Sequence, residues 1–325
     1  MIGMTLAARR PLVALVLMVV IEATNLSGVM AARGGIPVFQ ASVALGVLAV
    51  WFALRDPQAR ARLNAWTAIC AGLLAFYLAT QAVATVGSTD VFVSLDTMRR
   101  SALDCLFVML VLVLIQLTAR PWMAAGAIVI PLAVLSVLTV IDQVAFAGTA
   151  SFGGFSTVTT ASGEAITTLR FGGPLPDSNF WGRHLIMGLP LAAALLTRAL
   201  RSRSRWAIAG WALAIMAQLA GVYLTQSRGT FVAAAIAIGV WFLASGRSVR
   251  RWGLVSLPVA ALMLLIPGIG NRLVTAFEDV TRAQRGGHID PSVLGRLAAQ
   301  QEAGMMWEER PAFGFGPGTF SEQVI

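Results

Sequence analysis

The sequence predicts an all-α protein, a polytopic membrane helical bundle of about nine transmembrane helices, and two observations carry this prediction. Hydrophobic residues make up 57% of the 325 residues, whereas charged residues make up only 12%. A soluble domain carries about 25% charged residues, so the composition excludes a water-soluble enzyme and a disordered chain. The apolar residues also gather into runs of about 20, the length that crosses a bilayer.

Nine apolar runs predict nine spans in chain order. The first follows Arg9-Arg10, and its apolar stretch is too long for a signal peptide, so we interpret it as an uncleaved span. The predicted spans are 11–30, 36–54, 65–86, 101–119, 122–141, 179–196, 206–224, 229–244 and 252–270.

Charge predicts the orientation of these spans. The net charge is +9 and every basic residue is an arginine, but the arginines lie between apolar runs, so we exclude nucleic acid as a partner. Placing the N-terminus in the cytoplasm puts most of them inside, as the positive-inside rule requires. The inner arginines are Arg9, Arg10, Arg55, Arg60, Arg62, Arg120, Arg198, Arg201, Arg203, Arg205, Arg247, Arg250 and Arg251. The outer ones are Arg33, Arg99, Arg100, Arg170, Arg183 and Arg228.

Two long segments lie on the predicted outer side. Residues 142–178 are rich in Gly, Ser and Thr, and a second segment begins at residue 271. We therefore divide the chain into a transmembrane bundle, 1–270, and a periplasmic loop region, 271–325. In the loop region, Leu273, Val274, Phe277 and Val280 share one face of a predicted interfacial helix, 271–285, and a second helix is expected over 292–310.

Cysteine and histidine usage predicts no disulfide and no metal centre. Cys70 and Cys105 are expected near opposite ends of successive spans, far beyond the Cα spacing of about 5.5 Å in a disulfide. Neither His184 nor His288 lies near a cysteine in the sequence. His288 and Asp290 are spaced like an acid/base pair, but solvated loop residues have the same spacing.

The first candidate site is Ser227-Arg228-Gly229, at the outer end of the seventh span. Arg228 is held at the membrane surface by two predicted helices, where an arginine needs water, a carboxylate or an anion. Its planar fork suits a phosphate, and the backbone N–H groups at the start of the next helix favour an anion as well. A snorkelling interfacial arginine explains the same pattern.

The second candidate site surrounds the start of the sixth span. Asp177 and Asn179 precede or open the helix, and Arg183 and His184 lie one turn inside it. Ionisable residues within a span are candidates for function. A helix N-cap and a hydrogen bond to a neighbouring helix are the corresponding structural explanations.

The third candidate site is in the last loop. Arg296, Gln300 and Trp307 share one face of the predicted helix, and a glycine-rich turn with Gly316 and Gly318 follows it. Glycines allow positive φ and close backbone approach, and a turn without a ligand uses them in the same way. Glu22, Asn25 and Asp104 lie within spans and receive no role.

The order of these motifs resembles the O-antigen ligase and O-antigen polymerase (Wzy-type) superfamily of bacterial inner-membrane glycosyltransferases. The motifs are Asp-x-Asn before a span, Ser-Arg-Gly between spans, and then Gly-Arg, Trp-Glu-Glu-Arg-Pro and Phe-Gly-Phe-Gly-Pro-Gly-Thr-Phe in the outer loop. They cover residues 176–320.

The resemblance implies a GT-C-like fold and a periplasmic active face. It assigns Arg228 and Arg296 to catalysis, as groups that stabilise the pyrophosphate, and places a general-base histidine beyond Ile325. We therefore expect this chain to be incomplete at its C-terminus and inactive as a fragment. The expected substrate-binding residues are Asp177, Asn179, Arg183, His184, Ser227, Gly229, Gly316 and Gly318.

The sequence therefore predicts an O-antigen ligase-like glycosyltransferase without metal or other cofactor. The resemblance implies that the donor is an undecaprenyl-pyrophosphate-linked glycan and that the acceptor is lipid A-core, a glycan or a protein. A polymerase of the same superfamily, a flippase for lipid-linked sugars and a membrane scaffold are the alternatives, but no internal repeat of the transporter type is evident.

Overall fold

A computed structural model of the chain describes residues 9–159, 169–244 and 291–320. These residues form eleven α-helices, and the protein is a polytopic helical membrane protein, as predicted. Five of the helices are long and apolar enough to cross a membrane, and a bent pair makes a sixth candidate span.

Contacts divide the described chain into two compact units. One comprises residues 9–11, 46–119 and 291–320, and the other comprises residues 12–45, 120–159 and 169–244. The predicted division at residue 271 stays a prediction.

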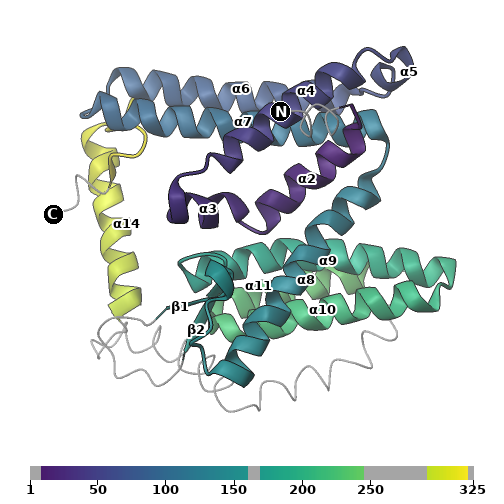
Figure 1. Ribbon diagram of the computed structural model, residues 1–325. Coiled ribbons are helices and arrows are strands. Elements are labelled where there is room, and N and C mark those ends of the chain that lie inside the picture. The colour runs from purple at the N-terminus through teal and green to yellow at the C-terminus, as the bar shows by residue number, and fades with distance from the viewer. Residues whose placement is uncertain (1–8, 160–168, 245–290, 321–325) are drawn as a thin grey trace. The chain divides into compact units, whose positions relative to one another are not determined.

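In the first unit, α6 (Ala65–Val86) and α7 (Val91–Thr118) lie side by side as an antiparallel pair (Figure 1). Asn64 caps α6 by accepting the N–H of Trp66, and Asp90 caps α7 by accepting the N–H of Val93. The unit also contains the short α5 (Pro57–Arg60), which packs on α7, the second half of α4 (Val38–Ala53), and α14 (Pro291–Glu309).

In the second unit, α8 (Pro121–Phe146), α9 (Ser178–Ser202), α10 (Arg205–Thr225) and α11 (Arg228–Ala244) pack together (Figure 1). Small residues let these helices approach closely. A Cβ on Gly188 would collide with Gln218 of α10, and a Cβ on Gly221 would collide with Ser136 of α8. Trp181, Leu185, Leu189 and Leu132 form the buried core between them.

The helix ends follow the predicted spans closely for residues 65–86 and 206–224. The helix predicted over 101–119 is longer than expected, because α7 begins at Val91. Apolar residues mark where a helix enters lipid, whereas the helix itself also includes the half-buried Asp96, which pairs with the exposed Arg99 and Arg100. The predicted span 252–270 and loop helix 271–285 lie outside the described residues.

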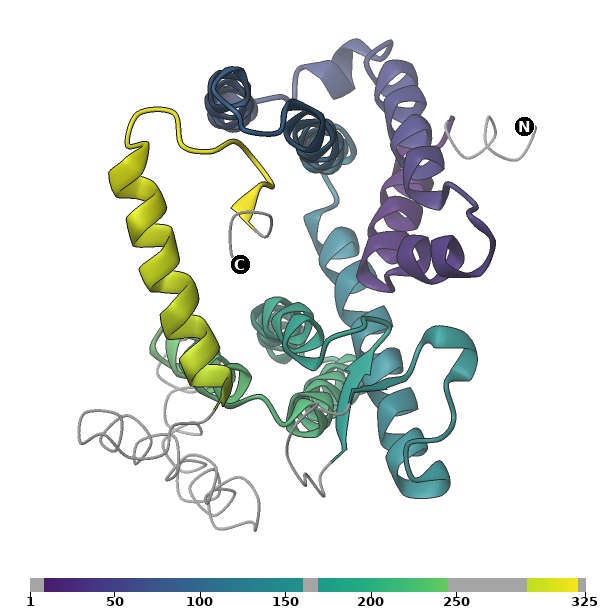
Figure 2. The ribbon, with the colours of Figure 1, turned by 90° about the vertical axis from the view of Figure 1, so that its left-hand side faces the viewer.

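Two features were not predicted. The first apolar run is broken: α2 (Pro11–Ala23) and α3 (Leu26–Gly34) meet at 66°, with Asn25 at a φ of 48° between them. The Gly/Ser/Thr-rich segment contains a 3-10 turn, η1 (Phe152–Gly154), and a small antiparallel hairpin of β1 (Thr157–Thr159) and β2 (Arg170–Gly173). The hairpin contacts the ends of α9 and α10 (Figure 2).

Candidate functional site

Asp177 fixes the beginning of α9. Its carboxylate accepts the backbone N–H groups of Asn179 at 2.6 Å and Phe180 at 3.2 Å, the geometry of a helix N-cap. The structural role suggested by the sequence is therefore confirmed, and a contact of Asp177 with substrate stays a prediction. The cap places Asn179 in the first turn of α9, where its side chain is half-buried.

The turn between α10 and α11 is only two residues long. Gln226 adopts a φ of 51°, and Ser227 then caps α11, since its Oγ accepts the N–H of Thr230 at 3.4 Å. Thr225, Ser227 and Thr230 are all buried, so the turn is packed against the bundle. Arg228 is the first residue of α11, as the sequence predicted.

The first turn of α11 packs closely against α9. A Cβ on Gly182 would collide with the Oγ1 and Cγ2 atoms of Thr230, so the two helices touch at this glycine. This contact brings the beginning of α11 next to the beginning of α9. By contrast, a Cβ on Gly229 would meet no atom within 4 Å, so the first turn of α11 is open at that residue.

Arg170 connects the beginning of α9 with the end of α10, and it was not among the site residues predicted from the sequence. From β2, its Nε donates to the backbone oxygen of Thr225 at 3.4 Å and its Nη2 donates to Oδ1 of Asn179 at 3.3 Å. Within the described ranges no carboxylate forms an ion pair with Arg170. Its position seven residues before Asp177, in a loop rich in Gly, Ser and Thr, was the only signal in the sequence.

Two contacts hold the strand that carries Arg170. Gly173, at a φ of 57°, lies so close to the buried ring of Trp181 that any Cβ would collide with it. Asn25, at the break between α2 and α3, donates from Nδ2 to the backbone oxygen of Pro174 at 2.9 Å. The break in the first apolar run therefore supplies a side chain that fixes the loop next to Arg170.

Arg183 and His184 form their described contacts within α9 and not with Arg170. Arg183 is exposed and its guanidinium stacks on the ring of Phe180, 5.0 Å from the centroid. Nδ1 of His184 lies 3.1 Å from the backbone oxygen of Phe180, within its own helix. The contacts with Phe180 account for the positions of both side chains. The predicted contacts of Arg183 and His184 with substrate stay predictions.

The glycine-rich turn belongs to the other unit, where it docks on the connection between α6 and α7. Ser94 Oγ donates to the oxygen of Pro317 at 3.1 Å, and the N–H of Thr89 donates to the oxygen of Phe315 at 3.0 Å. A Cβ on Gly316 would collide with Ser88 and Ser94, and one on Gly318 would collide with Thr97. Both glycines also have positive φ, 107° and 82°. Packing thus explains both, and substrate binding by them stays a prediction.

α14 presents its candidate residues to the exterior of this unit. Arg296, Gln300 and Trp307 are all exposed, and Trp307 is 68% exposed. At the end of the helix, Arg310 donates to the oxygen of Gly87 at 3.4 Å and stacks on Phe315. The helix predicted over 292–310 is confirmed, with bounds Pro291–Glu309.

Ligands for a metal do not gather in the part of the chain that the structure describes. There, no three His, Cys, Asp or Glu side chains come together, and Cys70 and Cys105 are free thiols.

The fold and these helix ends define the class of the protein: a polytopic helical membrane protein with polar, arginine-bearing helix termini. Residues 211–324 match the family model described as O-Antigen ligase, so the resemblance to that superfamily is confirmed. The matched segment includes Ser227-Arg228-Gly229, Arg296 and the glycine-rich turn. No curated protein and no solved structure matches the chain.

The family match supports a ligase-like function within the ligase and polymerase superfamily, with a lipid-linked glycan and an acceptor as partners in general.

Proposed function

We propose that this protein transfers a glycan from undecaprenyl pyrophosphate to an acceptor at the periplasmic face of the bacterial inner membrane, as an O-antigen ligase does. The observation that carries the proposal is the match over residues 211–324. This range contains the Ser-Arg-Gly, Gly-Arg, Trp-Glu-Glu-Arg-Pro and glycine-rich motifs in the order described above. The five long apolar helices support a substrate carried by a membrane lipid.

The polar ends of α9 and α11 are the proposed seat of the donor's pyrophosphate in their unit. Three features favour a phosphate there: Arg170 without a described carboxylate partner, Arg228 at the first position of α11, and the open helix N-terminus at Gly229. A helix N-terminus attracts anions, and a guanidinium binds phosphate through two parallel hydrogen bonds. Ser227, Asp177 and Asn179 hold the two helix ends in place.

The proposed reaction breaks the bond between the anomeric carbon and the pyrophosphate oxygen and forms a bond to an acceptor hydroxyl oxygen, whose proton passes to a general base. Negative charge develops on the leaving pyrophosphate as the bond breaks. The family resemblance assigns the stabilisation of this charge to the guanidinium groups of Arg228 and Arg296. Because two guanidinium groups supply this stabilisation, the proposed mechanism does not require a metal. Direct displacement predicts inversion at the anomeric carbon.

A polymerase of the same superfamily differs from a ligase in its acceptor, and the family match is compatible with both. Glycan analysis of a strain that lacks the gene separates them. Loss of the glycan from lipid A-core, with long lipid-linked chains retained, supports the ligase. Accumulation of single lipid-linked repeats indicates the polymerase, and repeats trapped on the cytoplasmic leaflet would contradict both and indicate a flippase.

A further inference from the structure

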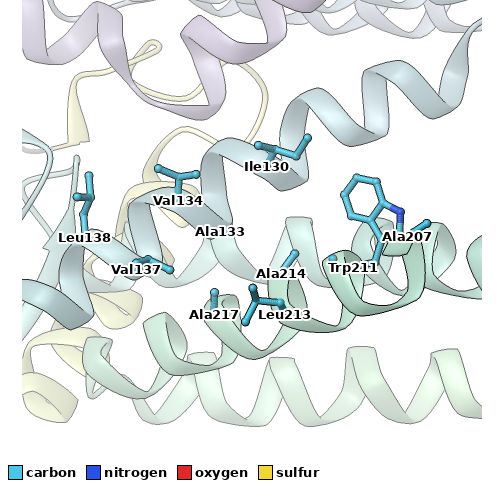
Figure 3. A pocket seen from close by; sticks show the side chains of 11 residues that line it. Ile130, Ala133, Val134, Val137, Leu138, Ala207, Trp211, Leu213, Ala214 and Ala217 are labelled. Atoms are coloured by element: carbon cyan, nitrogen blue, oxygen red, sulfur yellow. The ribbon is translucent and has the colours of Figure 1, made fainter. Parts of the chain in front are cut away.

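An apolar groove runs along α8 and α10 in the second unit, with a volume of about 530 Å³ (Figure 3). Ile130, Val134 and Val137 form its α8 side. On the α10 side, Gly210 and Ala214 leave room, and the exposed Leu213 forms the rim.

One end of the groove lies at a cluster of arginines, which we call the basic edge. The basic edge consists of the exposed Arg120, Arg198, Arg201, Arg203 and Arg205, at the beginning of α8, the end of α9 and the beginning of α10. The sequence contains no Asp or Glu between Asp104 and Asp142 or between Asp177 and Glu278, so these helices bring no acidic side chain to the edge.

Side-chain contacts connect the basic edge to the groove. The guanidinium of Arg198 stacks on Trp122 of α8, 4.9 Å from the ring centroid. Ala207, which lines the groove, is two residues from Arg205. Figure 3 places Ala207 and Trp211 at one end of the groove and Leu138 at the other. Trp206 is 91% exposed and Trp122 is 44% exposed, as is typical of aromatic residues at a membrane interface.

We propose that this groove binds one anionic phospholipid, with an acyl chain in the groove and the phosphate at the basic edge. The charge of the edge favours an anionic headgroup, since arginines at a membrane surface attract acidic lipids. The length of the groove favours a chain from a single leaflet. From Ala207 to Ala217 α10 rises by about 15 Å, half of the roughly 30 Å hydrocarbon core.

This lipid site is separate from the proposed donor site. Arg205 begins α10 and Thr225 ends it, so the basic edge and the pyrophosphate seat lie at opposite ends of the same helix. The groove is therefore not the place where the donor's pyrophosphate reaches Arg170, and the inference does not depend on the transfer reaction.

Native mass spectrometry of the purified full chain in detergent tests the proposal. Phosphatidylglycerol and phosphatidylcholine are added separately, and the wild-type protein should retain phosphatidylglycerol at least tenfold more strongly. Each arginine at the membrane surface strengthens the binding of an anionic lipid about fivefold. The double variant Arg198→Gln/Arg205→Gln should therefore lose at least tenfold, whereas Arg9→Gln/Arg60→Gln, with the same loss of charge in the other unit, should retain the preference.

A second pair of variants tests the groove itself. Gly210→Leu adds an apolar side chain at a residue that lines the groove, and its Cβ meets no atom within 4 Å. Gly72→Leu on α6, where a Cβ also meets no atom within 4 Å, is the matched control. Retention of phosphatidylglycerol should fall in the first variant alone. Equal retention of phosphatidylglycerol and phosphatidylcholine by the wild-type protein would overturn the proposal. Equal retention of phosphatidylglycerol by a test variant and its matched control would overturn it too. One-for-one displacement of phosphatidylglycerol by undecaprenyl phosphate, or a disulfide between copies carrying Leu213→Cys, would overturn it as well.

Discussion

Replacement of Gly182 by alanine should push the first turn of α11 away from α9. The new Cβ collides with Oγ1 and Cγ2 of Thr230, and Cβ of Thr230 lies only 3.0 Å from its position. Overpacking costs about 1–3 kcal/mol, and alanine regains about 0.5–1 kcal/mol over glycine within a helix. The difference leaves a fall in the free energy of unfolding of between about 0 and about 2.5 kcal/mol, with its centre at about 1 kcal/mol.

The assay is unfolding of the purified protein by SDS, with Gly239→Ala as the control, since a Cβ at Gly239 meets no atom within 4 Å. That control should be unchanged or slightly more stable. Thr230→Ala removes both colliding atoms, so the double variant Gly182→Ala/Thr230→Ala should recover most of the loss, which a double-mutant cycle measures. Equal stability of Gly182→Ala and Gly239→Ala, or strictly additive effects in the cycle, would refute the close contact.

Three further predictions concern the neighbouring contacts. Arg170→Gln should lower the rate of glycan transfer about tenfold while membrane insertion is unchanged, because a hydrogen bond of a charged group contributes about 1.5 kcal/mol at the lower end. Full activity of Arg170→Lys would show that transfer does not depend on the guanidinium of Arg170. Asn25→Gly keeps the left-handed backbone but removes the bond to Pro174, so the free energy of unfolding should fall by about 1 kcal/mol, and an unchanged value would show that the bond does not form. Gly316→Ala should lower the thermal unfolding midpoint more than Gly314→Ala does. Both glycines have positive φ, but only Gly316 is in close contact with Ser88 and Ser94. Equal midpoints of the two variants would contradict this close contact.

Local signals in the sequence predicted most helices, because each long apolar run ends at polar or capping residues. The helix Ala65–Val86 coincides with its predicted range, since Asn64 caps its start and Gly87 follows its end. The Asp177 cap and the short turn at Ser227 were predicted in the same way.

Features that depend on distant contacts could not be read from the sequence. Asn25 sits in an apolar run, and only its bond to Pro174, 149 residues away, reveals why the run breaks there. Arg170 lies in a loop with no periodicity, so its contacts with Asn179 and Thr225 required the three-dimensional structure. Gly316 and Gly318 were recognised as a turn, but the hydroxyl groups that hold that turn lie more than 200 residues earlier.

The central claim is that Arg228 stabilises the donor's pyrophosphate during transfer, and one measurement tests it most directly. Membranes from a gene-deletion strain that expresses the full-length protein, wild type or Arg228→Ala, are assayed for glycan transfer from a lipid-linked donor. The variant should insert at the wild-type level, accumulate uncleaved donor and transfer at least tenfold more slowly, with partial recovery in Arg228→Lys. Wild-type transfer by Arg228→Ala would contradict the account.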